Sequence, residues 1–213
     1  MGTIKQGILG GFSGKVGTVV GASWKGISYM RGQAQHVKNP RTAAQTYNRA
    51  ALQLITDTLR PIIPTLRLTF AKSAGKMSAF NKAVQINYKK AIVNQDGQPV
   101  VDYSKLILSK GTLKRFSYLL ITDESFSGEY TIEALNDDNS QIEYSGMIFF
   151  IYDKRKSSWF TGIVSEPFTT GEGFNYEGIP LLGSSSQFLG FACVYDSATG
   201  QVSDPIAEVE ING

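Results

Sequence analysis

The pattern of apolar residues changes near residue 99, and this change constrains the fold more than any other feature of the sequence. Between residues 39 and 92 apolar side chains recur at helical spacing, whereas from Val100 onward they alternate with polar ones. Helices followed by a series of short strands are typical of an α+β chain. We therefore expect a hairpin and a helical segment over residues 1–98 and a β-rich domain over residues 99–213.

The first 38 residues contain nine glycines and predict a β-hairpin. Two runs of β-favouring residues, 15–20 and 24–31, flank the small residues 21–23, which predict the turn. An isolated hairpin is only marginally stable in water. We therefore expect this hairpin to pack on the rest of the chain or on a neighbouring subunit.

A helix is expected to begin at Asn39 and Pro40, which suit the N-cap and the first helical position. Its apolar stripe would consist of Tyr47, Ala51, Leu54, Ile55, Leu59 and Ile62. Because Pro61 and Pro64 each lack a backbone donor, this helix should break or kink near Arg60.

A second helix is predicted from Ser78, whose side chain suits an N-cap, to about Ile92. One face of this helix would carry Phe80, Val84 and Tyr88. The turn-forming residues 97–99 then end the helical segment.

The alternating pattern of the second half predicts a set of short strands. The expected strands cover 101–108, 116–122, 129–135, 144–152, 158–164, 178–182, 188–196 and 206–211. Short strands at this spacing, separated by turn residues, suggest an antiparallel β-sandwich of the immunoglobulin or fibronectin type.

The formal net charge of +3 conceals a basic half and an acidic half. Residues 1–98 hold 14 Lys and Arg against two acids, a net +12, and residues 99–213 hold seven basic and 16 acidic residues, a net −9. Such asymmetry points to a polyanionic partner, or to attraction between opposite halves of two copies. The basic residues are spread along the chain, so they do not form the dense cluster of a localisation signal.

No motif in the sequence indicates an enzyme. Gly14 and Lys15 match part of a phosphate-binding loop, but the earlier glycine position is Leu9 and the hydroxyl position is Val16. His36 is the single histidine, and no acid precedes it in the chain. We expect His36 to be a surface residue of a linker and not a catalytic base, because a triad needs a carboxylate beside its imidazole.

We expect no cofactor and no metal site. Cys193 is the single cysteine and has apolar neighbours, so it is expected to be a small buried residue of a strand and not a reactive thiol. Residues 136–139 are Asn-Asp-Asp-Asn and are expected to form an ordinary turn. Weak calcium binding is the alternative for this loop, although it lacks the spacing of an EF-hand.

No apolar run approaches the roughly 20 residues that a membrane-spanning helix needs. The glycines of the N-terminus interrupt any apolar core of a secretory signal. We therefore expect no membrane span and a cytoplasmic protein, or one that is part of a larger particle released from the cell.

Residues 7–21 read GILGGFSGKVGTVVG and are followed by Trp24-Lys25-Gly26 and Tyr29-Met30-Arg31. This opening resembles a family of uncharacterised bacterial proteins that is defined as a domain of unknown function. Residues 39–42, Gln45 and Arg49 and, later, residues 102–106 also resemble this family, and only the first 50 residues are specific to it. The resemblance implies no activity, ligand or catalytic residue.

The sequence favours a non-enzymatic structural or assembly protein whose basic N-terminal segment docks on a protein partner or on another copy of the chain. The expected partner-binding residues are Lys15, Trp24, Lys25, Tyr29, Arg31, Arg41 and Arg49. Binding of nucleic acid by the basic half is the first alternative, because cations are interleaved with aromatic residues there. The second is a carbohydrate-binding β-sandwich that uses Trp159, Phe160 and the 174–176 loop.

Overall fold

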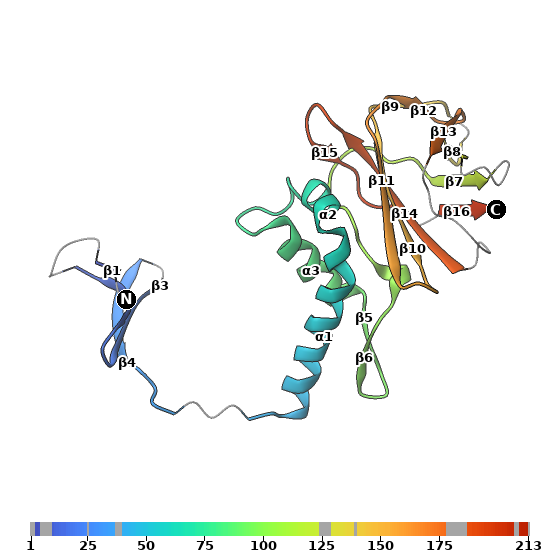
Figure 1. Cartoon of the computed structure of the whole chain (residues 1–213). Helices are drawn as coiled ribbons and strands as arrows, with labels where there is room; N and C mark the ends of the chain where they lie inside the picture. The colour runs from blue at the N-terminus through green and yellow to red at the C-terminus, as the bar shows by residue number, and fades with distance from the viewer. Residues whose placement is uncertain are drawn as a thin grey trace. The chain divides into compact units, whose positions relative to one another are not determined.

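The structure is a computed structural model of the chain (Figure 1). It describes residues 3–4, 10–24, 26–36, 40–123, 129–138, 140–177, 187–206 and 209–212. The chain divides into an N-terminal unit, residues 1–42, and a main unit, residues 43–213. Both helices and strands are present, which confirms the mixed fold, and the helices belong to the main unit.

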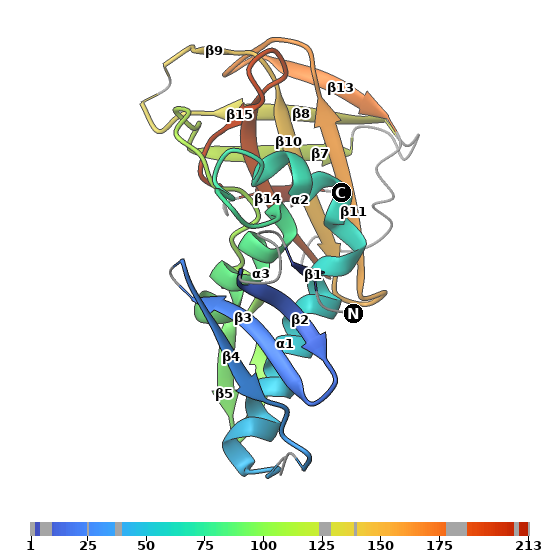
Figure 2. The same ribbon diagram turned by 90° about the vertical axis from the view of Figure 1, so that its left-hand side faces the viewer.

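The N-terminal unit is one antiparallel sheet of four strands in the order β1-β2-β3-β4 (Figure 2). Its strands are β1 (Thr3–Ile4), β2 (Phe12–Val16), β3 (Val19–Trp24) and β4 (Ile27–Gly32). The expected hairpin is therefore present, and it is extended by further strands at its N-terminal side.

The turns of this sheet lie at glycines other than the expected ones. Residues 21–23, predicted as the turn, are part of β3, and that prediction is wrong. The chain reverses at Gly17 (φ 58°) and Gly26 (φ 84°), where a positive φ favours glycine. Gly21 serves packing instead, since a side chain there would collide with Phe12.

The main unit begins with a layer of helices. These are α1 (Ala43–Leu59), the 3₁₀ turn η1 (Arg60–Ile62), α2 (Ile63–Thr69) and α3 (Ala79–Lys90). The expected break near Arg60 is confirmed, but the first helix begins at Ala43 and not at Pro40. Thr42 directly precedes that helix and is of a residue type favoured at the N-cap. Asn39 lies outside the described residues.

The cap of the second predicted helix is confirmed, because the Ser78 hydroxyl accepts a hydrogen bond from Asn81 N at 3.1 Å. After α3 comes a hairpin of β5 (Ile92–Gln95) and β6 (Gln98–Val101), which was not predicted. Its turn is Asp96-Gly97, with φ of 51° and 81°. An Asp-Gly pair between short strands is a recognised hairpin signal.

The strand predicted over residues 101–108 is wrong. Val101 ends β6, and the 3₁₀ turn η2 (Tyr103–Lys105) follows. The cause is local, because Asp102 Oδ1 accepts hydrogen bonds from the Ser104 backbone N at 3.2 Å and hydroxyl at 2.6 Å. A carboxylate that binds the backbone two residues ahead stabilises a turn against an extended strand.

Two four-stranded sheets complete the main unit. The first sheet has the order β11 (Ser158–Val164), β10 (Met147–Asp153), β14 (Phe188–Asp196), β15 (Gln201–Val202). The second has the order β13 (Gly173–Glu177), β8 (Glu129–Leu135), β7 (Tyr118–Asp123), β16 (Val209–Asn212), and a short pair joins β9 (Glu143–Tyr144) to β12 (Phe168–Thr169). These pairs are antiparallel except that β16 runs parallel to β7. The strand expected over residues 178–182 lies outside the described residues.

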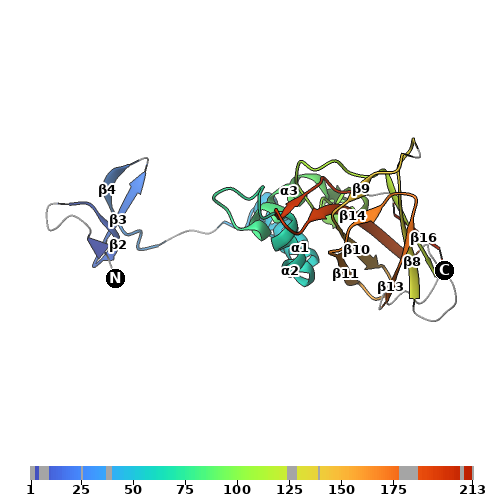
Figure 3. The same ribbon diagram turned by 90° about the horizontal axis from the view of Figure 1, so that it is seen from above.

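Strand β10 lies at the centre of three layers, with the helices on one side of the first sheet and the second sheet on the other (Figures 1 and 3). Met147, Phe149 and Ile151 enter the hydrophobic core that the two sheets share. Ile148 and Phe150 enter a second core, beneath the helices. This explains why β10 is apolar at nearly every position: both of its faces are buried.

A buried asparagine holds the helical layer to the segment that follows η2. Asn87 is fully buried, and its Oδ1 accepts a hydrogen bond from Ile107 N at 2.7 Å. Its Nδ2 donates to Ile107 O at 2.7 Å and to Ala83 O at 3.0 Å. The side chain therefore pairs with residue 107 as a neighbouring strand would, between the buried Leu106 and Leu108.

We predict that Asn87→Ala lowers the free energy of unfolding by about 3 kcal/mol, because it removes the partner of both the N–H and the C=O of the half-buried Ile107 and one hydrogen bond to Ala83. Asn81→Ala, at an exposed position of the same helix, is the matched control and should change it by less than about 0.5 kcal/mol. Urea unfolding followed by circular dichroism measures both. Equal effects of the two substitutions would contradict this role.

Candidate functional site

Alternation along the strands places four of the predicted binding residues on one face of the N-terminal sheet. Cross-strand partners share a face, and β3 pairs Val20 with both Lys15 and Arg31. In the same way Trp24 lies opposite Ile27, and Ala22 lies opposite Tyr29. We call this the cation–aromatic face, formed by Lys15, Val20, Ala22, Trp24, Ile27, Tyr29 and Arg31.

Large apolar side chains on this face are open to solvent. The exposed fractions are 64% for Trp24, 68% for Ile27 and 46% for Tyr29. The three side chains line a shallow hollow of about 270 Å³. On the opposite face Phe12 packs over Gly21, and two large apolar residues, Val16 and Met30, are 54% and 70% exposed.

The N-terminal sheet has no hydrophobic core of its own among the described residues. Both core clusters of the described chain consist of side chains from the main unit. A small sheet normally needs a second apolar layer to be stable. Burial of a large apolar side chain contributes about 1.5–3 kcal/mol, so a partner that covered this face would stabilise the sheet by several kcal/mol.

The cation–aromatic face carries positive charge without compensation from its own segment. Residues 1–42 include six Lys and Arg and no acid. Lys15 and Arg31 are exposed on the same face as the aromatic side chains. The face therefore combines exposed apolar area with positive charge.

Four of the seven predicted binding residues come together here: Lys15, Trp24, Tyr29 and Arg31. Arg41 is exposed in the connection before α1, and Arg49 is exposed on α1 in the main unit, so neither lies on the sheet. Lys25 lies outside the described residues. Ile27 was missed, although its alternation with Tyr29 and Arg31 along one strand is a readable signal.

The main unit has a groove where the ends of β11 and β13 meet the connecting residues 165–172. Its volume is about 470 Å³. Its lining is formed by Ile163, Val164, Ser165, Glu166, Pro167, Phe168, Thr169, Glu172, Gly173, Phe174, Asn175 and Tyr176. Glu166 and Glu172 are exposed, whereas Phe174 and Tyr176 are half-buried. We call this cavity the acidic groove.

The aromatic residues considered for carbohydrate binding are not assembled into one platform. Trp159 packs in the core beneath the helices, and its Nε1 donates to Thr58 O at 3.0 Å. Its neighbour Phe160 packs against the core between the two sheets, which is the other face of β11. Phe174 and Tyr176 line the acidic groove instead.

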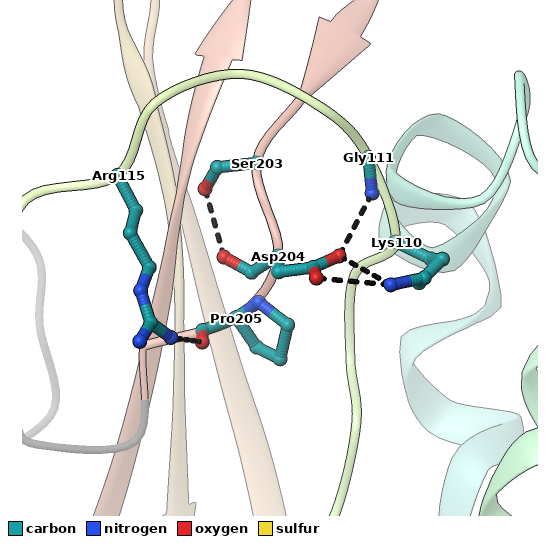
Figure 4. Close-up of polar contacts among 6 residues, drawn as sticks. All are labelled: Lys110, Gly111, Arg115, Ser203, Asp204 and Pro205. Carbon is teal, nitrogen blue, oxygen red and sulfur yellow. Dashed lines mark hydrogen bonds and ion pairs between the residues drawn. The ribbon is translucent and has the colours of Figure 1, made fainter.

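A polar cluster around Asp204 joins the segment after the helices to the end of the first sheet (Figure 4). Both oxygens of its carboxylate accept from Lys110 Nζ at 2.9 Å, and Oδ1 accepts from Gly111 N at 3.2 Å. Arg115 donates to Pro205 O at 3.1 Å. These polar groups are hydrogen-bonded to one another and hold residues 110–115 to residues 204–205. We therefore assign the cluster a structural role.

The Asn136 loop has the hydrogen bonds of a turn. Asn136 is buried, and its Nδ2 donates to Ser140 O at 2.8 Å and to Thr170 Oγ1 at 3.1 Å. Asp138 accepts from Ser140 N at 3.0 Å. No group of three His, Cys, Asp or Glu that could share a metal ion occurs in the described part of the chain. His36 is exposed, as expected.

Cys193 is fully buried in β14, which confirms the prediction of a small core residue. Burial raises the pKa of its thiol to about 12. The folded chain therefore keeps its proton between about pH 9 and pH 12, whereas the unfolded chain loses it. The contribution of this thiol to the free energy of unfolding is fully present below about pH 9 and decreases as the pH rises towards 12.

We predict that the free energy of unfolding falls by about 1–2 kcal/mol more in the unmodified protein than in Cys193→Ala between pH 8 and pH 10. Urea unfolding of both proteins at the two pH values measures the difference. All other ionisable groups are the same in both proteins, so their contribution cancels. Parallel pH dependences would show that the thiol is not protected by burial.

The fold is therefore a mixed one of helices and mainly antiparallel strands, and it has two notable surfaces, the cation–aromatic face and the acidic groove. The model of a family of unknown function, DUF6266, matches residues 11–154, and the chain belongs to this family. The match includes the cation–aromatic face and β10 and ends before the acidic groove. No curated protein matches the sequence. In the described residues no helix is long and apolar enough to cross a membrane.

Proposed function

We propose that this protein is a non-enzymatic structural or assembly protein whose N-terminal sheet docks, through its cation–aromatic face, on a protein partner or on another copy of the chain. One observation carries the proposal. The sheet exposes Trp24, Ile27 and Tyr29 side by side, and none of its described residues belongs to a hydrophobic core. Exposed apolar side chains grouped in this way are typical of interaction sites.

The composition of the face supports binding to protein. Trp, Tyr and Arg are the residue types most often found at the centre of protein interfaces. Lys15 and Arg31 would favour an acidic partner and speed the encounter with it at low salt. The ion pairs Lys105–Asp102, Lys110–Asp204 and Lys156–Asp153 join residues of the same half, so they leave the opposite net charges of the two halves unchanged.

The main unit would then be the displayed part of the molecule. Its two sheets share one core, and this supports a sandwich of the immunoglobulin or fibronectin type as part of the proposal. The parallel pair of β7 and β16 and the helical layer would be additions to such a sandwich.

We expect the double variant Trp24→Ser with Ile27→Ser to weaken association at least about tenfold, because it removes two apolar side chains from the centre of the face. Association is measured on the full-length protein by light scattering over a range of concentrations, and by recovery of bound proteins from the source cells.

Met30→Ser is the matched control. Met30 is 70% exposed and belongs to β4, as Ile27 does, but its side chain lies on the opposite face of the sheet. The Met30→Ser variant should associate like the unmodified protein. Equal loss in the control, or a protein that stays monomeric and recovers no partner, would overturn the proposal.

Nucleic-acid binding is a second candidate function, favoured by the combination of Trp24 and Tyr29 with Lys15 and Arg31 on a single sheet face. Aromatic rings on an open sheet can stack with bases, while the cations contact phosphates. Protein docking remains our first proposal, because Ile27 adds apolar area that neither bases nor phosphates require.

Titration with a fluorescent single-stranded oligonucleotide tests this candidate. If the face binds nucleic acid, Arg31→Gln should lower the affinity and reduce the salt dependence by about one counterion, whereas Met30→Ser should change neither. Lack of salt-sensitive binding by the unmodified protein would eliminate this function.

A further inference from the structure

We propose that the partner of the cation–aromatic face is the acidic groove of a second copy of this chain. The inference rests on the proposed function and specifies its partner. The N-terminal sheet of one copy would place Trp24 and Ile27 in the groove, and Arg31 near Glu166 and Glu172.

The two surfaces are complementary in chemistry. The cation–aromatic face has apolar side chains at its centre and the cations Lys15 and Arg31 beside them. The acidic groove has apolar and aromatic walls, formed in part by Phe174 and Tyr176, and the exposed carboxylates Glu166 and Glu172. Residues that line the groove include no Lys or Arg.

The size of the groove suits side chains of this kind. At about 470 Å³ it lies within the range of roughly 300–1,000 Å³ that takes up a drug-sized ligand. An indole ring and a branched aliphatic side chain are smaller than such a ligand. Ile163 of the groove is itself 41% exposed and would be covered on docking.

Strand edges add a second element of complementarity. Strand β4 ends the N-terminal sheet, and β11 and β13, which border the groove, each end their sheets among the described strands. Edge strands present backbone donors and acceptors that a further strand can pair with. Such strand addition would contribute backbone hydrogen bonds to the side-chain contacts.

The complementarity favours head-to-tail docking over a symmetric dimer. Two cation–aromatic faces placed against each other would oppose Lys15 and Arg31 of one copy to the same cations of the other, and like charges across an interface are unfavourable. A sheet that docks in a groove elsewhere on the next copy makes a heterologous contact, which forms rings or open chains.

A complementation experiment with full-length chains tests the inference. The donor variant carries Trp24→Ser and Ile27→Ser, and the acceptor variant carries Glu166→Lys and Glu172→Lys. All four positions are exposed, so both chains should fold. The donor variant keeps an intact groove, and the acceptor variant keeps an intact sheet.

Sedimentation velocity at low ionic strength should show association of the unmodified chain beyond the dimer. Each variant alone should be monomeric, and an equimolar mixture should form a heterodimer that grows no further. The control Asp137→Lys with Glu210→Lys makes the same charge change at exposed acids outside the groove and should associate like the unmodified chain.

The outcomes separate this inference from the proposed function. If the donor variant loses association while the acceptor variant keeps it, the sheet docks at another surface. This result overturns the groove as the docking site but leaves the proposed function intact. The unmodified chain could instead be monomeric and bind a different protein through Trp24 and Ile27. That result would overturn the proposal that the partner is a second copy. If the donor variant associates like the unmodified chain, both proposals fail.

Discussion

The burial of β10 on both faces is the interaction on which the main unit depends. Alternate side chains of this strand fill two different cores, and those of its neighbour β14 do the same, so the helices and the second sheet pack on opposite faces of the first sheet. Asn87 adds a directional contact to this packing, since its buried side chain forms hydrogen bonds with both the N–H and the C=O of Ile107. Both cores of the main unit are therefore built without residues 1–42.

The N-terminal sheet is the opposite case. It has regular strand pairing and glycine turns, yet its largest side chains face solvent, and neither core of the described chain includes any of its residues. A sheet of this kind gains stability mainly when another surface covers it. Its positive charge would favour an acidic surface, and in the proposed assembly the acidic groove of a second copy would provide one. Stability and assembly would then depend on the same contact.

Local signals in the sequence were sufficient where a single residue type determines the backbone. Ser78 was predicted to cap α3, and the prolines after Leu59 were predicted to interrupt the first helix, as the structure shows. Cys193 was identified as a core residue from its apolar neighbours. Predictions failed where two local signals compete. The small residues 21–23 suggested a turn, but the backbone reverses at Gly17 and Gly26, and a shift of the turn changes which side chains share a face. Lys15, Trp24, Tyr29 and Arg31 were predicted as binding residues, but the sheet face that they share was not visible in the sequence.

The sequence by itself determined the mixed fold, the basic and acidic halves and the family, because composition, periodicity and a specific motif are properties of the linear chain. Only the tertiary structure decided which elements belong together. It placed the helices on the outer face of the first sheet, and this accounts for the continuous apolar run of β10. It also brought β11 and β13 to the groove, although they pair with different strands and belong to different sheets. Such contacts depend on long-range strand pairing, which the alternation of a single strand does not specify.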